Sequence, residues 1–276
     1  MKRGELLKKT ISVMLMLVLS VGLVLFSAPE AHAASSGKLV KSVKHYSNSG
    51  SKWKWTSTTT YKYNSKNDPI KIYETYKIGK KTYKVTYTLK YTYKNGKKIE
   101  AKEYRKEDNG PNNLDTITTY DSKGRPYLIE YYDPDNPDIV FSTTKYVYGK
   151  NGYVTKINDD TFIQYKWNGT KAKALRSFLV IDGEKYKRAN TSFNTKGFVH
   201  KPKVYTQADP VMIYTYKFKN GQIKTINLEM QEGYDRYYEK YTLTYTKKSI
   251  TPKKYRAMIN SILCGNNPDT IGMVWY

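Results

Sequence analysis

The chain has 276 residues, a formal net charge of +24 and 29 tyrosines. Its single cysteine excludes a disulfide framework, and its three histidines make a His-rich metal centre a poor expectation. So basic a chain is expected to attract polyanions in a salt-dependent way. Lysines on strand surfaces also serve a simpler purpose, because they aid solubility and block edge-to-edge aggregation.

The first 33 residues have the pattern of a bacterial secretory signal peptide. Four basic residues precede an uncharged run over 11–28, and Ala31-His32-Ala33 matches a small-x-small cleavage site. Cleavage before Ala34 removes two net charges and leaves +22. The apolar run is also long enough for an uncleaved membrane anchor. After cleavage we expect no stable membrane insertion, and a protein that is secreted or associated with the cell wall.

Residues 34–52 are rich in Ser, Gly and Lys and are predicted to be a flexible lead, with room for an edge strand at its end. From Trp53 the chain alternates between two kinds of side chain. Trp53 and Trp55 are predicted to share a face with Thr59, Tyr61 and Tyr63. Residues 53–276 are then expected to form one β domain.

The clearest strand lies between Tyr83 and Gly96. A period of two belongs to a β-strand, because successive side chains point to opposite faces of the sheet. Lys and Thr fill one face, including Lys84 and Lys90. The opposite, sheltered face is predicted to carry Tyr83, Val85, Tyr87, Leu89, Tyr91 and Tyr93.

The turn that ends this strand contains Asn95 and Gly96. A three-residue loop starting at Lys94 would pair Tyr91 with Ile99 and keep apolar side chains together. We therefore predict the three-residue loop rather than a two-residue one.

Glycine turns recur along the chain with aromatic residues before them and aliphatic residues after them, which predicts a degenerate hairpin repeat. They lie at Gly96, Gly124, Gly152, Gly169, Gly197 and Gly221. The predicted fold is all-β, an irregular antiparallel sheet of about fifteen short strands. So many strands should curl into a half-barrel or fold over as two layers.

One of these turns, Tyr120-Asp121-Ser122-Lys123-Gly124-Arg125, resembles the YD-repeat (RHS-type) family, whose units read Tyr-Asp-x-x-Gly-Arg before an apolar strand. In that family such units build long antiparallel sheets that encase cargo or present a surface at the cell exterior. This chain is too short for a large shell, so the resemblance implies hairpin geometry only.

The chain's one predicted helix covers about residues 252–263, with Thr251 as N-cap and Pro252 at its first position. Its apolar stripe comprises Tyr255, Met258, Ile259, Ile262 and Leu263. We expect it to pack on the concave or open face of the sheet and to end at Gly265, with Cys264 buried. The apolar tail, residues 271–276, is predicted to form a last strand.

No catalytic constellation is evident. His45 and His200 lie in Lys-rich surroundings without a local orienting group, so we predict no enzyme, no cofactor and no metal site. The acidic run Asp133–Asp138 lacks the glycine bend and the closing glutamate of a calcium loop, and a proline-stiffened hairpin loop is the simpler interpretation.

Tyrosines interleaved with lysines suit a surface that stacks on sugars while holding anionic groups. Each tyrosine pair that occupies adjacent strand positions must send one ring outward. The predicted ligand-contacting surface comprises Tyr131, Tyr132, Tyr237, Tyr238, Lys84 and Lys90.

Three hypotheses of function follow. The first is a secreted, non-enzymatic envelope protein that binds an anionic polymer such as teichoic acid or an acidic glycan, and nucleic acid only non-specifically. The second is a half-barrel carrier that holds a lipid or other apolar ligand under the C-terminal helix. The third is a small hydrolase whose site is assembled from residues scattered in the sequence.

Overall fold

The computed structural model describes residues 37–48, 52–133, 136–150, 154–168, 171–205, 211–232 and 235–264. The predicted signal peptide, Gly265 and the apolar tail lie outside the described residues. Within the described ranges, no helix is both long enough and apolar enough to cross a membrane.

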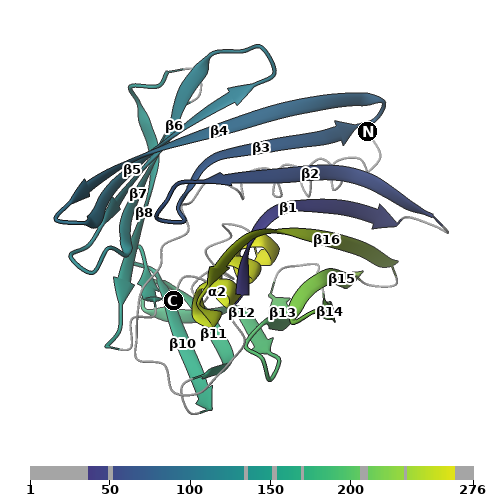
Figure 1. Ribbon diagram of the computed structural model, residues 1–276. Coiled ribbons are helices and arrows are strands. Elements are labelled where there is room, and N and C mark those ends of the chain that lie inside the picture. Colours follow the sequence, from purple (N-terminus) through teal and green to yellow (C-terminus); the bar gives the residue numbers. More distant parts are fainter. Residues whose placement is uncertain are drawn as a thin grey trace.

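The described chain forms sixteen antiparallel strands and one helix, which confirms the predicted all-β fold class (Figure 1). The elements are β1 (Gly37–Asn48), β2 (Trp53–Tyr63), β3 (Pro69–Ile78), β4 (Lys81–Lys94), β5 (Lys97–Glu107), β6 (Asn112–Tyr120), β7 (Pro126–Tyr132), β8 (Val140–Tyr148), β9 (Val154–Ile157), β10 (Thr161–Asn168), β11 (Lys171–Ile181), β12 (Glu184–Phe193), β13 (Val199–Val204), β14 (Val211–Lys219), β15 (Gln222–Glu232), β16 (Asp235–Ile250) and α2 (Pro252–Cys264).

Each strand pairs with its neighbours in sequence, and β1 pairs with both β2 and β16, so the sheet closes into a barrel. The prediction of a flexible lead over 34–52 was therefore wrong for Gly37–Asn48. Leu39, Val40 and Val43 point into the core and are buried. Three apolar residues among lysines are a weak strand signal in the sequence, and pairing on both sides with β2 and β16 supplies the missing stability.

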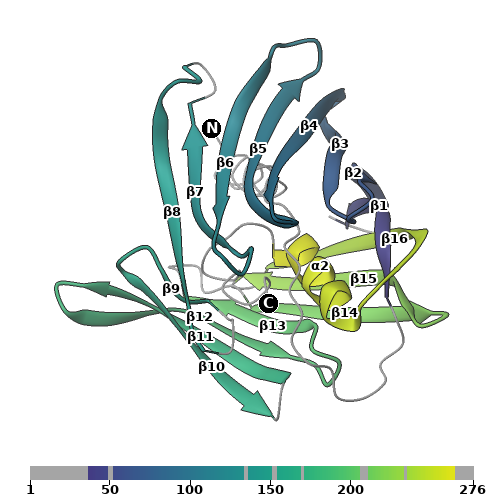
Figure 2. The same cartoon turned by 60° about the vertical axis from the view of Figure 1, so that its left-hand side comes forward.

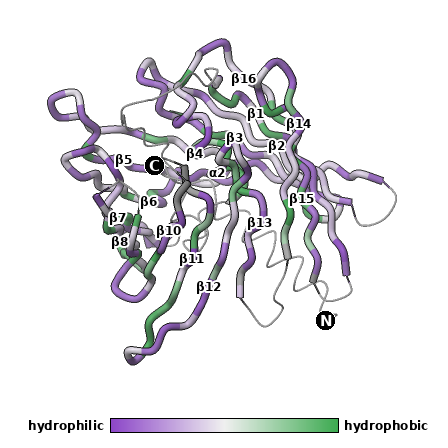
Figure 3. Tube along the Cα trace, turned by 90° about the horizontal axis from the view of Figure 1, so that it is seen from below, coloured by the Kyte–Doolittle hydropathy of each residue, from purple (hydrophilic) through white to green (hydrophobic). Residues whose placement is uncertain are grey.

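The alternation predicted for residues 83–93 is confirmed in β4. Val85, Tyr87 and Leu89 are buried on the inner face, whereas Lys84 and Lys90 are exposed on the outer face. Figure 3 shows the same pattern at the scale of the whole chain, with hydrophobic positions interspersed among hydrophilic ones along the strands.

The turn after β4 differs from the prediction. Lys94 pairs with Lys97, so Asn95 and Gly96 form a two-residue loop, and both have positive φ as such hairpin turns require. The extra residue is Ile99, which forms a bulge in β5. The bulge realigns the inward-facing residues of the two strands, so that Ala101, not Ile99, lies opposite Tyr91.

The same bulge recurs in seven hairpins, always between the last aromatic residue of an even-numbered strand and the residue before it. Bulges bend strands and strengthen their twist, so this repeat curls the sheet at one rim and helps it to close. The register shifts lie at Lys62/Tyr63, Thr92/Tyr93, Thr119/Tyr120, Val147/Tyr148, Lys166/Trp167, Ser192/Phe193 and Lys217/Phe218.

Tyrosine hydroxyls reinforce the same rim from inside the barrel. In each case a tyrosine late in an even-numbered strand donates to a backbone carbonyl near the start of the preceding strand. The donor and acceptor pairs are Tyr63 with Val40, Tyr91 with Pro69, Tyr148 with Pro126, Tyr165 with Val154, Tyr216 with Val199, and Tyr245 with Ile223.

In the Tyr120–Arg125 unit, Asp121 organises the turn. Its Oδ1 accepts hydrogen bonds from the backbone N–H groups of Lys123 and Arg125, and its Oδ2 accepts one from Arg125 Nε at 2.8 Å. The Arg125 guanidinium lies 4.1 Å from the centre of the Tyr148 ring. The motif residues therefore serve hairpin geometry.

Helix α2 lies inside the ring of strands, as Figures 1 and 2 both show. Thr251 Oγ1 accepts a hydrogen bond from Lys254 N at 3.3 Å, which confirms the predicted N-cap. The stripe residues Tyr255, Met258 and Ile259 are buried against the inner faces of the strands. The side chain of Cys264 lies outside the described part of the chain.

One prediction of parity was wrong. Trp53 and Trp55 do not share a face with Thr59 and Tyr61, because a bulge at Thr56 shifts the register between them. The Thr56 hydroxyl lies 2.8 Å from His45 Nδ1 and donates to the His45 carbonyl. The bulge turns both tryptophans to the outer face, where Trp53 pairs with Asn48 and Trp55 with Tyr46.

Candidate functional site

The outer surface of β2–β5 carries a concentration of lysines with two tyrosines among them. The strand registers place all of these side chains on the face opposite Tyr87 and Ile72. We call this surface the lysine face. It comprises Lys62, Lys71, Tyr73, Lys84, Lys90, Lys102, Tyr104 and Lys106.

Two pairs of lysines stand directly opposite each other across neighbouring strands of this face. Lys62 of β2 pairs with Lys71 of β3, and Lys90 of β4 pairs with Lys102 of β5. Like charges at such positions destabilise a sheet. The lysine face therefore holds an excess of positive charge at a cost to folding.

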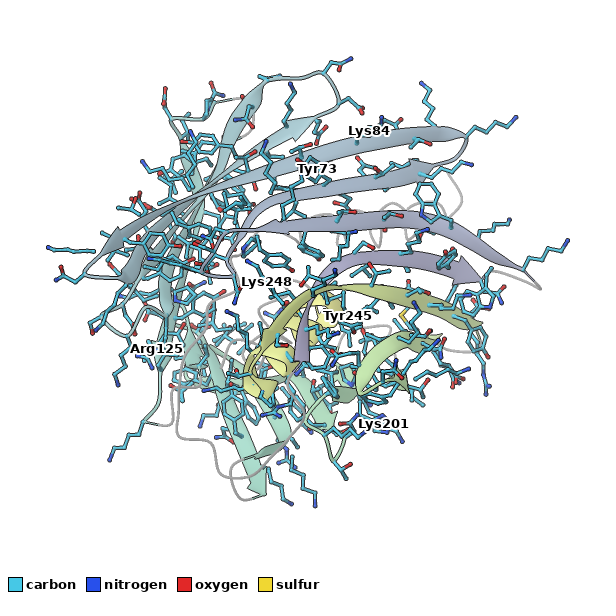
Figure 4. The ribbon with its side chains drawn as sticks, in the orientation of Figure 1. Tyr73, Lys84, Arg125, Lys201, Tyr245 and Lys248 are labelled. Carbon is cyan, nitrogen blue, oxygen red and sulfur yellow. The ribbon has the colours of Figure 1, made fainter. Side chains whose placement is uncertain are left out.

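Tyrosine rings lie beside these lysines. Lys62 Nζ is 5.2 Å from the centre of the Tyr73 ring, and Lys90 Nζ is 4.8 Å from the centre of the Tyr104 ring. An aromatic face attracts a cation and holds its alkyl stem against the sheet. Figure 4 shows Tyr73 and Lys84 on the neighbouring strands β3 and β4.

Acidic neighbours are sparse on the lysine face. Lys102 Nζ lies 3.9 Å from Glu100 Oε1, in an exposed pair worth little energy. Among the described residues, no ion pair is found for the other five lysines of the face. An approaching anion therefore meets cations whose charge is not already neutralised by protein carboxylates.

The structure brings together only part of the predicted ligand-contacting surface. Lys84 and Lys90 lie on the lysine face. Tyr131 is half-buried against the inner core, 6.3 Å from the ring of Phe141, and Tyr132 is half-buried at the end of β7.

The two rings of the second tyrosine pair, Tyr237 and Tyr238, point to opposite faces of the sheet, as adjacent strand positions require. Tyr237 is half-buried, whereas Tyr238 is on the outer face and 38% exposed. The aromatic residues that do accompany the lysines are Tyr73 and Tyr104. Sequence reasoning missed them, although each shares the parity of nearby lysines and that pattern marks the outer face.

The inner wall carries charged groups that the sequence pattern did not predict to meet. Burial raises the pKa of Tyr87, and the nearby charges of Glu74, Arg105, Glu103 and Asp115 also act on it. Burial raises the pKa of Glu74 to about 7, although the charge of Arg105 works in the opposite direction. Burial likewise raises the pKa of Asp115. Glu74, Glu103 and Arg105 occupy inward-facing strand positions, where regular alternation would predict apolar side chains.

A second ionisable group lies where β1 meets β16. His45 Nε2 is 3.3 Å from Glu239 Oε2, the Tyr241 hydroxyl donates to the same carboxylate, and the His45 ring stacks on Tyr241 at 4.6 Å. Burial favours a raised pKa for Glu239, but the hydrogen bond and charge of His45 outweigh it and lower the pKa. The arrangement is that of a buried histidine whose Nδ1 is hydrogen-bonded to Thr56 and whose Nε2 lies close to a carboxylate. Within the described part of the chain, no group of three or more His, Cys, Asp or Glu side chains is arranged to hold a metal ion.

Comparison with known proteins adds little. No model of a protein family matches the chain, and no curated protein matches it significantly. Among solved structures, a porin-like protein from Bacteroides uniformis aligns over 75% of this chain and 98% of its own, at 12% identity and a TM-score of 0.46. A porin-like protein from Bacteroides vulgatus aligns over 76% of this chain and 100% of its own, at 10% identity and a TM-score of 0.21.

A third similar structure is a TarM mutant from S. aureus in complex with Fondaparinux, α-GlcNAc-glycerol and UDP. It aligns over 68% of this chain but only 24% of its own, at 14% identity and a TM-score of 0.17. All three TM-scores are below 0.5, so these likenesses carry no argument about fold or function. The barrel architecture rests on the strand pairing itself.

Proposed function

We propose that the protein is a secreted, non-enzymatic protein of the bacterial envelope that binds an anionic polymer, such as teichoic acid or an acidic glycan, through the lysine face. The observation that carries the proposal is the placement of lysine opposite lysine on the outside of a closed barrel. A closed barrel has no sheet edge to protect, so blocking of edge-to-edge aggregation does not account for these pairs.

Binding of a polyanion would relieve the repulsion between the paired lysines. It would also release the counterions that accompany the polymer, which makes affinity fall steeply with salt. The mature net charge of +22 would speed the encounter by long-range attraction. Nucleic acid would bind by the same charge, without sequence preference.

The carrier hypothesis needs a continuous apolar pocket under α2. The described residues there pack against one another instead. The Val40 N–H lies 3.4 Å from Met258 Sδ, the Tyr255 hydroxyl accepts a hydrogen bond from Ile223 N, and Asn260 Oδ1 accepts one from Val199 N. These contacts favour a structural role for the helix over a lid, and so favour the polymer-binding hypothesis.

A second candidate is the hydrolase, which the inner-wall carboxylates support. A buried glutamate with a pKa near neutrality has the property of a general acid, and Asp115 and Glu103 are further carboxylates nearby. Incubation of isolated walls with wild type and with Glu74→Gln tests this candidate. Release of reducing sugar by wild type that is lost in Glu74→Gln would establish it, and no release by wild type would dismiss it.

Sedimentation with isolated Gram-positive cell walls tests the main proposal. The mature protein should bind walls at 50 mM salt and leave them between 200 and 500 mM, because polyanion contacts are lost as salt rises. Walls stripped of teichoic acid should retain less protein. Retention that is unchanged across the salt series would overturn the proposal.

A further inference from the structure

A pocket of about 240 Å³ lies on the outer wall of the barrel, where β14, β15 and β16 approach the start of β2. Trp53 and Tyr238 contribute aromatic rings, and Asn227, Glu229 and Thr215 contribute polar groups. The pairing of Tyr238 with Glu229 and of Asn227 with Thr215 places these side chains on one face. That face is the outer one. Tyr241 lies three positions after Tyr238 on β16, so it points to the opposite face, and it is buried inside the barrel.

Trp53 reaches this pocket because of the bulge at Thr56, which turns the start of β2 outward. Lys240 then fixes the ring, since its Nζ lies 4.6 Å from the Trp53 ring and 4.9 Å from the Tyr46 ring. Trp53 nevertheless remains 40% exposed and Tyr238 38% exposed. Trp53 is therefore held by a cation contact, and both rings are accessible from solvent.

The chemistry of the pocket suits an uncharged sugar ring. The C–H face of a pyranose stacks on an aromatic ring, while its hydroxyls both donate and accept hydrogen bonds. The Asn227 amide and Thr215 hydroxyl can do the same, and the Glu229 carboxylate accepts. Glu229 is paired with Arg236 at 3.5 Å, so its charge is partly balanced, and the pocket offers hydrogen-bonding groups and rings rather than a surplus of charge. Its volume is below the roughly 300–1,000 Å³ of pockets for drug-sized ligands, which fits a single ring.

We infer that this pocket binds one uncharged hexopyranose unit of a polysaccharide. The strands that form the pocket continue through β1 and β2 into the lysine face. A polymer with both sugar rings and anionic groups can therefore occupy the pocket and the lysine face together. This last step rests on the proposed function, whereas binding of a free sugar does not.

Titration with two neutral oligosaccharides, chitotetraose and maltotetraose, tests the inference through tryptophan fluorescence and calorimetry. At least one should bind wild type, and Trp53→Ala should weaken that binding by about tenfold or more. Tyr127→Ala removes another exposed ring, on β7, and should bind as wild type does. Trp53→Phe keeps a flat ring and should restore part of the affinity, which guards against a folding defect in Trp53→Ala.

Failure of both sugars to bind wild type, or equal binding by Trp53→Ala, would overturn the inference. Measuring wall binding with the same protein preparations distinguishes a failure of the sugar-pocket inference from a failure of the proposed function. If Trp53→Ala still binds walls in a salt-dependent way while no sugar binds, the inference alone fails. If a sugar binds through Trp53 but wall retention is independent of salt, the proposed function fails and the sugar pocket stands.

Discussion

His45 Nε2 and Glu239 Oε2 lie 3.3 Å apart, and this contact joins the first strand of the barrel to the last. Thr56 holds the other ring nitrogen of His45 at 2.8 Å, so the contact extends to β2. Closure brings together residues that lie 194 positions apart in a chain of 276. Buried polar groups at such a seam are costly when one partner is removed.

Replacing Glu239 with Gln should lower the free energy of unfolding by about 1–3 kcal/mol at pH 6. Because the pKa of Glu239 is lowered in the folded state, its contribution is present above the ordinary pKa and is lost as pH falls through the folded value. Urea unfolding should therefore show a difference in stability between wild type and Glu239→Gln at pH 6, and this difference should shrink below about pH 4. The control is Glu229→Gln, which removes an exposed ion pair with Arg236. An equally large loss of stability in that variant would contradict the account.

Glu74 predicts the opposite pH dependence. Its folded pKa of about 7 is above its ordinary value of 4.5, so the folded state binds more protons and loses stability as pH rises from 4.5 to 7. Glu74→Gln should abolish this loss and be more stable than wild type at pH 8, by up to about 3 kcal/mol. Urea unfolding at pH 5 and pH 8 measures the difference. Glu184→Gln, at an exposed hairpin position, should leave the pH dependence of wild type intact.

The tyrosine hydrogen bonds at the rim should be worth measurable stability. Tyr91→Phe removes the bond to the Pro69 carbonyl, at 2.8 Å in wild type, and should cost about 0.5–1.5 kcal/mol. Tyr127→Phe changes an exposed ring and should cost almost nothing. Equal midpoints for the two variants in thermal unfolding would show that the rim bonds contribute no net stability.

Gly37 leaves room for the docked helix. A Cβ at this position would lie 2.3 Å from Tyr255 Cβ, so Gly37→Ala should push α2 from β1. Hydrogen exchange should increase in α2 while the amides of β4 and β5 stay protected. Gly79→Ala meets no atom within 4 Å and strains only its own turn, so it should leave α2 unchanged. Unaltered exchange of α2 in Gly37→Ala would refute the close contact.

The sequence predicted what strict alternation can predict. Val85, Tyr87 and Leu89 are sheltered because parity alone decides their side, and α2 follows from its cap and stripe. Bulges escaped prediction, since one extra residue at Ile99 or Thr56 reverses every later side chain without changing local composition. Closure of the barrel was not predicted either, because it depends on the pairing of β1 with β16, which are far apart in the sequence.

The candidate site was predictable only in part. Lys84 and Lys90 were identified from their alternation with apolar residues. The pairing of Lys62 with Lys71 required the register of β2 with β3, which the turn over 64–68 sets. Glu74 and Glu103 were missed because charged residues at inward positions look like breaks in the pattern rather than parts of a cluster.

The salt dependence of wall binding by two charge-matched variants tests the central claim most directly. One variant carries Gln in place of Lys62, Lys71, Lys90 and Lys102. The other carries Gln at four exposed lysines elsewhere on the barrel, Lys185, Lys201, Lys217 and Lys224. The lysine-face variant should lose most of its binding and flatten the slope of log affinity against log salt by roughly 2–4 units, whereas the second variant should stay close to wild type. Equal losses in both variants would show that net charge alone holds the protein on the wall, and would contradict a dedicated lysine face.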